Sequence, residues 1–187
     1  MWGSMMKKAM WRAPLAAFIA IGALFTSSPA QASVSQGYVA GSGTVTDDWG
    51  DEGEMATNAH RYSGATGMWQ WVLYADGAIE SNGGAFDMAD IDCDFGANTT
   101  AATKSWQASH GLNADGRAGS DTLSKADNNL VGISSNTQVR YVGKAHTVWL
   151  AYTDGPYWVD VPGCTCEGAT FLASYGKPDT VSGSGCW

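Results

Sequence analysis

Basic residues are scarce in this sequence. Its 187 residues include 10 Lys and Arg against 18 Asp and Glu, which gives a formal net charge of −8. Proteins that bind nucleic acid or anionic membranes rely on clustered positive charge. The composition therefore predicts neither nucleic acid nor a membrane surface as a partner.

Long apolar runs are also few. The longest extends from Ala13 to Phe25, follows three basic residues and precedes the small residues at 30–32. It is shorter than the roughly 20 residues that span a bilayer, and this order is typical of a cleaved signal peptide. We therefore expect residues 1–32 to be a signal peptide and the protein to be secreted, extracellular or associated with a cell wall. The other 155 residues carry a formal charge of −11.

Familiar catalytic patterns are missing as well. The sequence has no GxSxG or HExxH motif, and its three histidines, His60, His110 and His146, are widely spaced. We therefore expect no catalytic residues, no metal and no cofactor. A cell-wall hydrolase or peptidase that uses residues of the C-terminal segment remains an alternative.

The four cysteines are Cys93, Cys164, Cys166 and Cys186. An even number of cysteines in an exported chain favours disulfide bonds. Because cysteines two positions apart are awkward to join, we expect Cys164 and Cys166 each to pair with Cys93 or Cys186. Zinc binding is the alternative, although no nearby histidine or second cysteine pair completes a familiar zinc spacing.

Residues 92–123 contain the same pattern twice. Each copy has an aspartate, a glycine four residues later and a threonine three residues after that glycine. The first copy is Asp92, Gly96 and Thr99, with Phe95 before the glycine, and the second is Asp115, Gly119 and Thr122, with Gly116 after the aspartate. Each copy predicts an Asx-type turn followed by a helix start, with the threonine able to cap free backbone amides. Between the copies we expect a helix over residues 101–109 that ends at Gly111.

Another apolar helical pattern begins at Ala65 and ends at Asp76-Gly77. Its pair Trp69-Gln70 is repeated 37 residues later as Trp106-Gln107. The large tryptophans are suited to fill a shared core, and the glutamine amides can satisfy backbone groups where the helices meet.

Taken together, the residues DxDFGxxTxxAxxxWQxxxGLxxDGxxGxxTL resemble the small three-helix peptidoglycan-binding domain found beside many secreted bacterial cell-wall hydrolases. The resemblance covers about residues 65–127. It implies a helical bundle that binds peptidoglycan without catalysis, through the stem peptide or the glycan. Cys93 stands where the family has glycine. If that position requires a positive φ, cysteine is strained there by about 1 kcal/mol, and a disulfide worth about 2–4 kcal/mol would offset the strain.

The resemblance also implies where a ligand would bind. We expect a shallow groove between the two turns, flanked by Trp106 and Arg117, whose guanidinium could pair with a stem-peptide carboxylate. His110 is a further candidate contact, with a structural role at the end of its helix as the alternative. A third hypothesis is an exported interaction or inhibitor protein that uses the domain only as a scaffold. The sequence does not predict the oligomeric state.

The remaining segments complete the expected architecture. Residues 33–64 form an N-terminal arm, with an acidic turn whose Trp49 packs back on the domain, and residues 76–92 hold an insertion. After residue 127, Gln138–Tyr152 and Tyr157–Val161 read as two strands joined by a turn. The predicted fold class is α+β: residues 65–127 form a small three-helix peptidoglycan-binding-like bundle, and residues 128–187 form a disulfide-linked C-terminal β-hairpin appendage.

Overall fold

The computed structural model describes residues 37–42, 44–133, 138–152, 155–160 and 170–173. Within them lie three α-helices, namely α1 (Gly64–Asp76), α2 (Ala97–Ser109) and α3 (Ser120–Ala126), together with the short 3₁₀ helices η2 (Val45–Asp47), η3 (Met88–Asp90) and η4 (Asp127–Asn129). An antiparallel five-stranded sheet follows in chain order, with β1 (Leu130–Gly132), β2 (Gln138–Val142), β3 (Thr147–Tyr152), β4 (Tyr157–Asp160) and β5 (Thr170–Leu172). The α+β class is confirmed.

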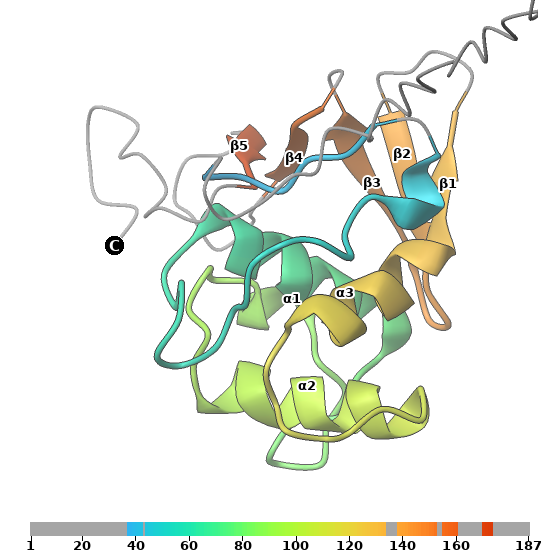
Figure 1. Ribbon diagram of the computed structural model, residues 1–187. Coiled ribbons are helices and arrows are strands. Elements are labelled where there is room, and N and C mark those ends of the chain that lie inside the picture. Colours follow the sequence, from blue (N-terminus) through green and yellow to red (C-terminus); the bar gives the residue numbers. More distant parts are fainter. Residues whose placement is uncertain (1–36, 43, 134–137, 153–154, 161–169, 174–187) are drawn as a thin grey trace, which may run out of the picture.

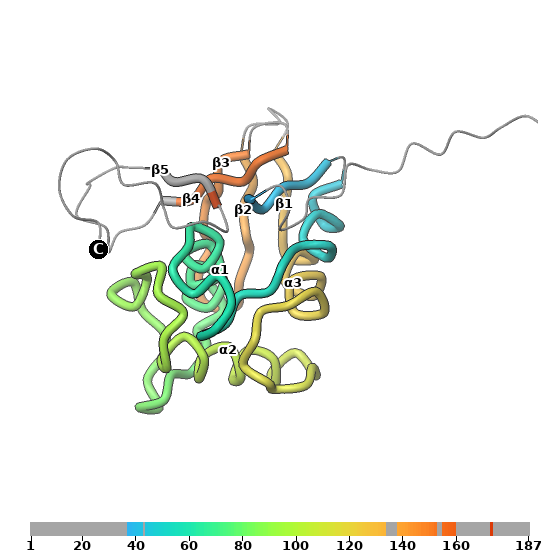
Figure 2. The backbone as a smooth tube through the Cα atoms, turned by 60° about the vertical axis from the view of Figure 1, so that its left-hand side comes forward, coloured from blue at the N-terminus to red at the C-terminus, as the bar shows by residue number. Residues whose placement is uncertain are grey.

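Helix α1 is the centre of the molecule. It packs against α2 on one side and against β2, β3, β4 and β5 on the other, so the sheet, α1 and α2 form successive layers (Figures 1 and 2). Trp69 of α1 meets Trp106 of α2 edge to face, with ring centroids 5.2 Å apart. The two tryptophans therefore share a core, as the repeated Trp-Gln pairs predict.

Both long helices end at glycines that the sequence identifies. Gly77 follows α1 with φ +62°, and Gly111 follows α2 with φ +74°. In each case the next residue donates its backbone N–H to a carbonyl five positions back, from Ala78 to Leu73 and from Leu112 to Gln107, at 2.9 Å. This is the Schellman arrangement, in which a left-handed glycine lets free carbonyls at the helix end find donors.

Helix α2 begins earlier than predicted, at Ala97 instead of residue 101. Its N-cap is Gly96, which has no side chain to cap the helix. Thr99 lies inside the first turn, where its hydroxyl donates to Asp94 O at 3.1 Å and does not cap an amide. The helix start is thus fixed by the preceding turn and not by a capping side chain.

The C-terminal part is more extensive than the predicted hairpin. Residues 138–152 form two strands, β2 and β3, instead of one, because the chain turns between Val142 and Thr147. The turn docks on α1, where Ala145 N and His146 N donate to Ala75 O at 2.9 and 2.8 Å. Tyr141 and Leu150 of the sheet belong to the same buried cluster as the helices. The sheet is therefore part of the core and not an appendage.

The N-terminal arm also joins this core. Val39 N donates to Ala173 O at 2.7 Å, and Tyr157 N donates to Val39 O at 2.9 Å. Trp49 is fully buried, stacked parallel to Tyr141 at 6.4 Å and edge to face with Tyr157 at 5.5 Å. Trp49 therefore packs back on the folded protein, as predicted, although its aromatic partners belong to the sheet and not to the predicted helical domain.

Some predictions fall on residues that the structure does not describe. The expected signal peptide at 1–32 and the cysteines Cys164, Cys166 and Cys186 lie outside the described residues, so the cleavage and the disulfide pairing stay predictions. Cys93 is buried and has φ +62°, the positive value that the family comparison led us to expect at its position. Among the helices of the described ranges, none has the length and apolar character to cross a bilayer.

Candidate functional site

The first of the two repeated turns is held by the buried amide of Gln70. Its Oε1 accepts the backbone N–H groups of Asp92 and Cys93 at 3.0 and 2.8 Å. Its Nε2 donates to Asp92 Oδ1 at 2.8 Å, Asp94 O at 3.1 Å and Thr99 Oγ1 at 3.1 Å. One side chain of α1 therefore satisfies both the turn and the first turn of α2.

The second turn is held in the same way by Gln107 of α2. Its Oε1 accepts from Gly116 N at 2.8 Å. Its Nε2 donates to Asp115 Oδ1 at 2.9 Å, Arg117 O at 2.9 Å and Thr122 Oγ1 at 3.0 Å. Each of these four partners has its equivalent among those of Gln70, which accepts one further hydrogen bond, from Asp92 N.

The two turns also have the same backbone conformation. Asp92 Oδ1 accepts from Asp94 N, and Asp115 Oδ1 accepts from Arg117 N, both at 2.9 Å. Cys93 and Gly116 take the same place with φ +62° and +80°. A left-handed residue is required there, which glycine adopts at less cost than cysteine. The structure thus contains one clamp-and-turn unit twice.

The N-terminal arm runs past both turns and pairs with each. Met55 N and Ala118 N exchange backbone hydrogen bonds with each other's carbonyls at 3.0 Å, and Phe95 N donates to Arg61 O at 2.8 Å. An ion pair accompanies each contact, Arg61 with Asp94 and Glu54 with Arg117. The charges are reversed between the copies, so the arm supplies the cation at the first turn and the anion at the second.

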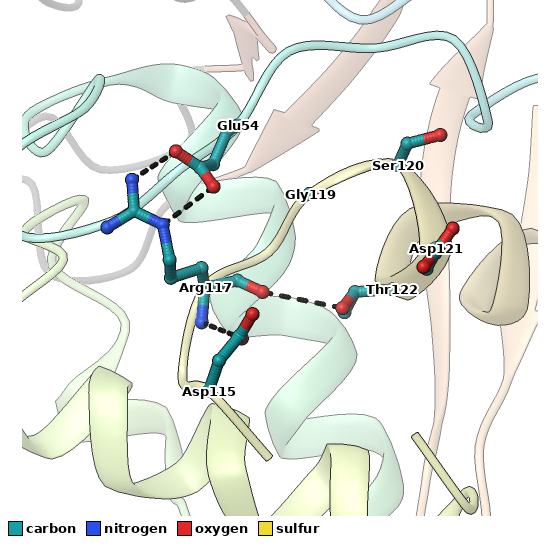
Figure 3. Close-up of a pocket in the computed structure, with 7 residues that line it drawn as sticks. All are labelled: Glu54, Asp115, Arg117, Gly119, Ser120, Asp121 and Thr122. Carbon is teal, nitrogen blue, oxygen red and sulfur yellow. Dashed lines mark hydrogen bonds and ion pairs between the residues drawn. The ribbon is translucent and has the colours of Figure 1, made fainter. Parts of the chain in front are cut away.

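A pocket of about 210 Å³ opens beside the second turn. Figure 3 shows its lining, with the forked pair of Arg117 and Glu54 on one wall and the start of α3 on the other; the lining residues are Glu54, Asp115, Arg117, Gly119, Ser120, Asp121 and Thr122. The wall at Ser120 is fixed because its hydroxyl donates to Gly50 O. The pocket is therefore built from the arm, the second turn and α3.

The charge of this pocket is negative. Its lining has three carboxylates, those of Glu54, Asp115 and Asp121, and one guanidinium, that of Arg117. The guanidinium is already hydrogen-bonded: Nε donates to Glu54 Oε2 at 2.6 Å, Nη2 donates to Glu54 Oε1, and Nη1 donates to Asn58 Oδ1 at 2.9 Å. The hydrogen bonds from Arg117 lower the pKa of Glu54. Burial alone would raise the pKa of Asp115, but hydrogen bonds from the Arg117 backbone and Gln107 outweigh it, and its pKa is lowered.

The three residues expected to contact ligand lie in different environments. Arg117 lines the pocket. Trp106 is 1% exposed, and its Nε1 donates to Asp76 Oδ2 at 2.5 Å, so its indole belongs to the core and not to the pocket wall. His110 is the C-cap of α2; its ring stacks on Trp106, with centroids 3.9 Å apart, and its Nδ1 lies 2.8 Å from Trp106 O. The structure therefore brings His110 to Trp106 and leaves Arg117 at the pocket.

Three pocket residues, Glu54, Ser120 and Asp121, were not singled out by the sequence. Glu54 lies in the acidic arm, 63 residues before its partner Arg117, and no local pattern connects them. Asp121 is an acidic residue in the first turn of α3. Its position after the second Gly-rich turn was a usable signal, because it is the first charged side chain beyond Gly119.

The described residues offer little for metal chemistry, since no group of three His, Cys, Asp or Glu side chains among them could hold a metal ion. The pocket presents carboxylate acceptors, a hydroxyl and a charge pair, which come from the arm, the second turn and α3.

The comparisons with known proteins agree with the repeated turns. No curated protein and no solved structure matches the chain significantly. One family model does match, over residues 81–125, which include both turns, all of α2 and most of α3. Its description is Putative peptidoglycan binding domain, so the chain contains a putative peptidoglycan-binding domain at these residues.

Proposed function

We propose that this protein is exported and binds cell-wall peptidoglycan without catalysis. The observation that carries the proposal is the pair of Gln-clamped turns, which lie inside the segment that matches the peptidoglycan-binding family. The basic and apolar pattern of residues 1–32 supports export. The pocket supports binding because Arg117 and Glu54 hold each other in an ion pair and Asp115 is fixed by hydrogen bonds, which leaves a preformed acidic surface at Asp115 and Asp121.

We further propose that the pocket takes a free amino group of the stem peptide. With Arg117 engaged by Glu54 and Asn58, the groups left to meet a ligand are the carboxylates of Asp115 and Asp121. Stem peptides carry both amino and carboxyl groups, and a negative pocket favours the amino groups. Arg117 then acts mainly by holding Glu54 and the arm in place.

Sedimentation with insoluble peptidoglycan tests this function. The full-length oxidised protein is mixed with purified cell-wall sacculi at moderate salt, and the bound fraction is measured in the pellet. We expect co-sedimentation with no fall in the turbidity of the suspension. Protein that stays in the supernatant would overturn the binding proposal, and clearing of the suspension would favour a cell-wall hydrolase.

The pocket itself is tested by Asp121→Asn, with Asp47→Asn as the matched control. Both aspartates are exposed and lie in the first turn of a helix, but only Asp121 lines the pocket. One charge-assisted hydrogen bond contributes about 1.5 kcal/mol, so Asp121→Asn is expected to weaken binding roughly tenfold. Equal binding by the two variants would remove the pocket from the proposal.

A further inference from the structure

The outer face of the sheet is a second surface, distinct from the pocket. The residues of β2 and β3 alternate between buried and exposed positions, and Val139, Tyr141, Val148 and Leu150 point into the core. Trp149 points outward and is 57% exposed; Val131 and Val142 on the same face are 40% and 42% exposed. An antiparallel sheet with one face on the core normally presents polar residues on its other face. This apolar group is therefore unusual.

The exposed tryptophan is oriented by its neighbours. Val131 of β1, Arg140 of β2 and Trp149 of β3 lie side by side in register. The guanidinium of Arg140 lies 5.7 Å from the Trp149 ring centroid. Such a contact restrains both side chains at small cost in solvation. Arg140 thus supports the ring, which keeps more than half of its surface open to solvent.

Arg140 also has unused hydrogen-bonding capacity. Its Nε is buried and has no hydrogen-bond partner, and the ion pairs of the described residues involve Arg61 and Arg117 instead. A buried donor without a partner is uncommon in folded proteins. Because Nε is buried, a ligand oxygen beside Trp149 would meet the other nitrogens of this half-buried guanidinium.

The charge of the face limits the choice of partner. The protein has 18 acidic residues, yet the outward positions of β1, β2 and β3 hold none; they are Val131, Gln138, Arg140, Val142, Thr147, Trp149 and Ala151. The outward positions of these three strands therefore combine the ring of Trp149 with hydrogen-bond donors and a single positive charge, and Trp158 of β4, which pairs with Ala151, adds a half-buried second ring on the same face. A ligand that suits it has an apolar ring face and many oxygen acceptors.

We propose that this face binds a glycan strand, with one pyranose ring stacked on Trp149 and its hydroxyl, amide or carboxylate oxygens bonded by Arg140. Sugar rings carry C–H groups on one face, which pack on an aromatic ring, and hydroxyls at the edge, which need polar partners. The inference does not rest on the pocket at Arg117, because the sheet lies outside the segment that matches the family. It adds a glycan contact to the proposed peptide contact.

The test separates the two contacts by using peptidoglycan from which an amidase has removed the stem peptides. Retention of the full-length protein on these peptide-free glycan strands is measured for the wild type, Trp149→Ala and Arg140→Gln. Tyr62→Ala is the matched control, because Tyr62 is also an exposed aromatic residue beneath an arginine, with Arg61 4.9 Å from its centroid, but lies on the arm. Trp149→Tyr retains an aromatic ring, and circular dichroism checks that each variant is folded.

We expect Trp149→Ala to weaken glycan binding about tenfold and Arg140→Gln severalfold, with Trp149→Tyr intermediate and Tyr62→Ala unchanged. Wild-type protein that ignores peptide-free glycan would overturn the inference while leaving peptide binding intact. Equal binding by Trp149→Ala and the wild type would overturn it too. Self-association that Trp149→Ala abolishes, without any glycan binding, would assign the face to a second copy of the chain instead.

Discussion

At the scale of single residues, the structure depends on Gln70 and Gln107. Each amide is nearly inaccessible to solvent, at 0% and 1% exposure, and serves several backbone and side-chain groups at once. Removing such an amide leaves buried donors and acceptors without partners, and each one costs about 1–3 kcal/mol.

Replacing Gln107 by alanine is therefore expected to lower the free energy of unfolding by about 3 kcal/mol, and Gln70→Ala by a similar amount. Urea denaturation followed by circular dichroism measures both. Gln138→Ala is the control, because Gln138 is exposed on β2 and should change stability by less than about 0.5 kcal/mol. Losses no larger than that of the control would show that the clamps do not hold the turns.

Asp127 gives the protein a pH dependence of its own. It is 2% exposed, accepts a hydrogen bond from Trp49 N at 3.1 Å, and lies near the acidic Asp47 and Asp48. Burial first and then the charges of these two aspartates raise its pKa from 3.8 to about 6, against the hydrogen bond from Trp49 N, which lowers it. The folded state therefore holds the proton more tightly than the unfolded state, and the resulting stability is present below about pH 4 and is lost as the pH rises through 6.

Comparing the wild type with Asp127→Asn isolates this effect, because asparagine can still accept from Trp49 N. We expect the stability of the wild type relative to the variant to fall by on the order of 2 kcal/mol between pH 4.5 and 7.5. Chemical denaturation at these two pH values measures the difference. Curves that run parallel across the range would contradict the raised pKa.

Some residue roles could be predicted from the sequence alone, whereas others depend on distant segments and could not. The glycine ends at Gly77 and Gly111 follow from local rules, because glycine readily adopts the positive φ that ends a helix. The positive φ of Cys93 was suggested only by the resemblance to the family, which has glycine at that position. The burial of Trp106 and the engagement of Arg117 by Glu54 depend on segments 30 and 63 residues away. No local pattern carries that information, so the predicted ligand groove was placed beside a buried tryptophan.

At the scale of elements, the sheet is joined to α1 by the turn between β2 and β3. Ala75 O accepts from Ala145 N and His146 N. Asp76 adds a second link, since its Oδ2 accepts from Tyr141 OH at 2.8 Å and its Oδ1 accepts from Lys144 N at 2.9 Å. The last residues of α1 thus fix where the sheet sits.

Gly143 allows this close approach. A Cβ added to it would lie 2.3 Å from Ala75 O and 2.4 Å from Ala75 C, and a backbone cannot easily move away. We expect Gly143→Ala to destabilise the fold by about 2–3 kcal/mol. Gly132→Ala is the control, because its Cβ would meet only Val45 at 3.7 Å. Thermal melting of both variants measures the effect, and equal melting temperatures would show that the turn does not dock tightly.

The same turn explains why the strands were predicted incompletely. The partial alternation of apolar and polar residues predicted one strand over 138–152 and another from Tyr157. Residues 143–146 interrupt the first without the Asn-Gly or Asp-Gly pair that would mark a tight turn. Such a turn is held by α1 in addition to its own hydrogen bond from Gly143 N to His146 O at 3.0 Å. The sequence pattern therefore reads 138–152 as one strand where the structure has two.

At the scale of the whole molecule, the three predicted parts, namely the arm, the helical domain and the C-terminal segment, contribute residues to one hydrophobic core. Val39 from the arm, Trp69 and Trp106 from the helices, and Tyr141 and Tyr157 from the sheet belong to one buried cluster. Contacts between these parts are as buried as the contacts within them. The helices therefore share one hydrophobic cluster with the sheet and the arm, whereas independent domains have cores of their own.

We therefore expect the full-length protein to unfold in one cooperative transition. Differential scanning calorimetry should give a calorimetric enthalpy equal to the van't Hoff enthalpy, and near-ultraviolet circular dichroism, which reports on the packed aromatic rings, should change together with the far-ultraviolet signal. Trp49→Phe, which disturbs the contacts with Tyr141 and Tyr157, should lower the midpoint and keep the single transition, because arm, helices and sheet lose stability together. Two separated transitions, with only one of them shifted by this substitution, would show that the helical part folds without the rest.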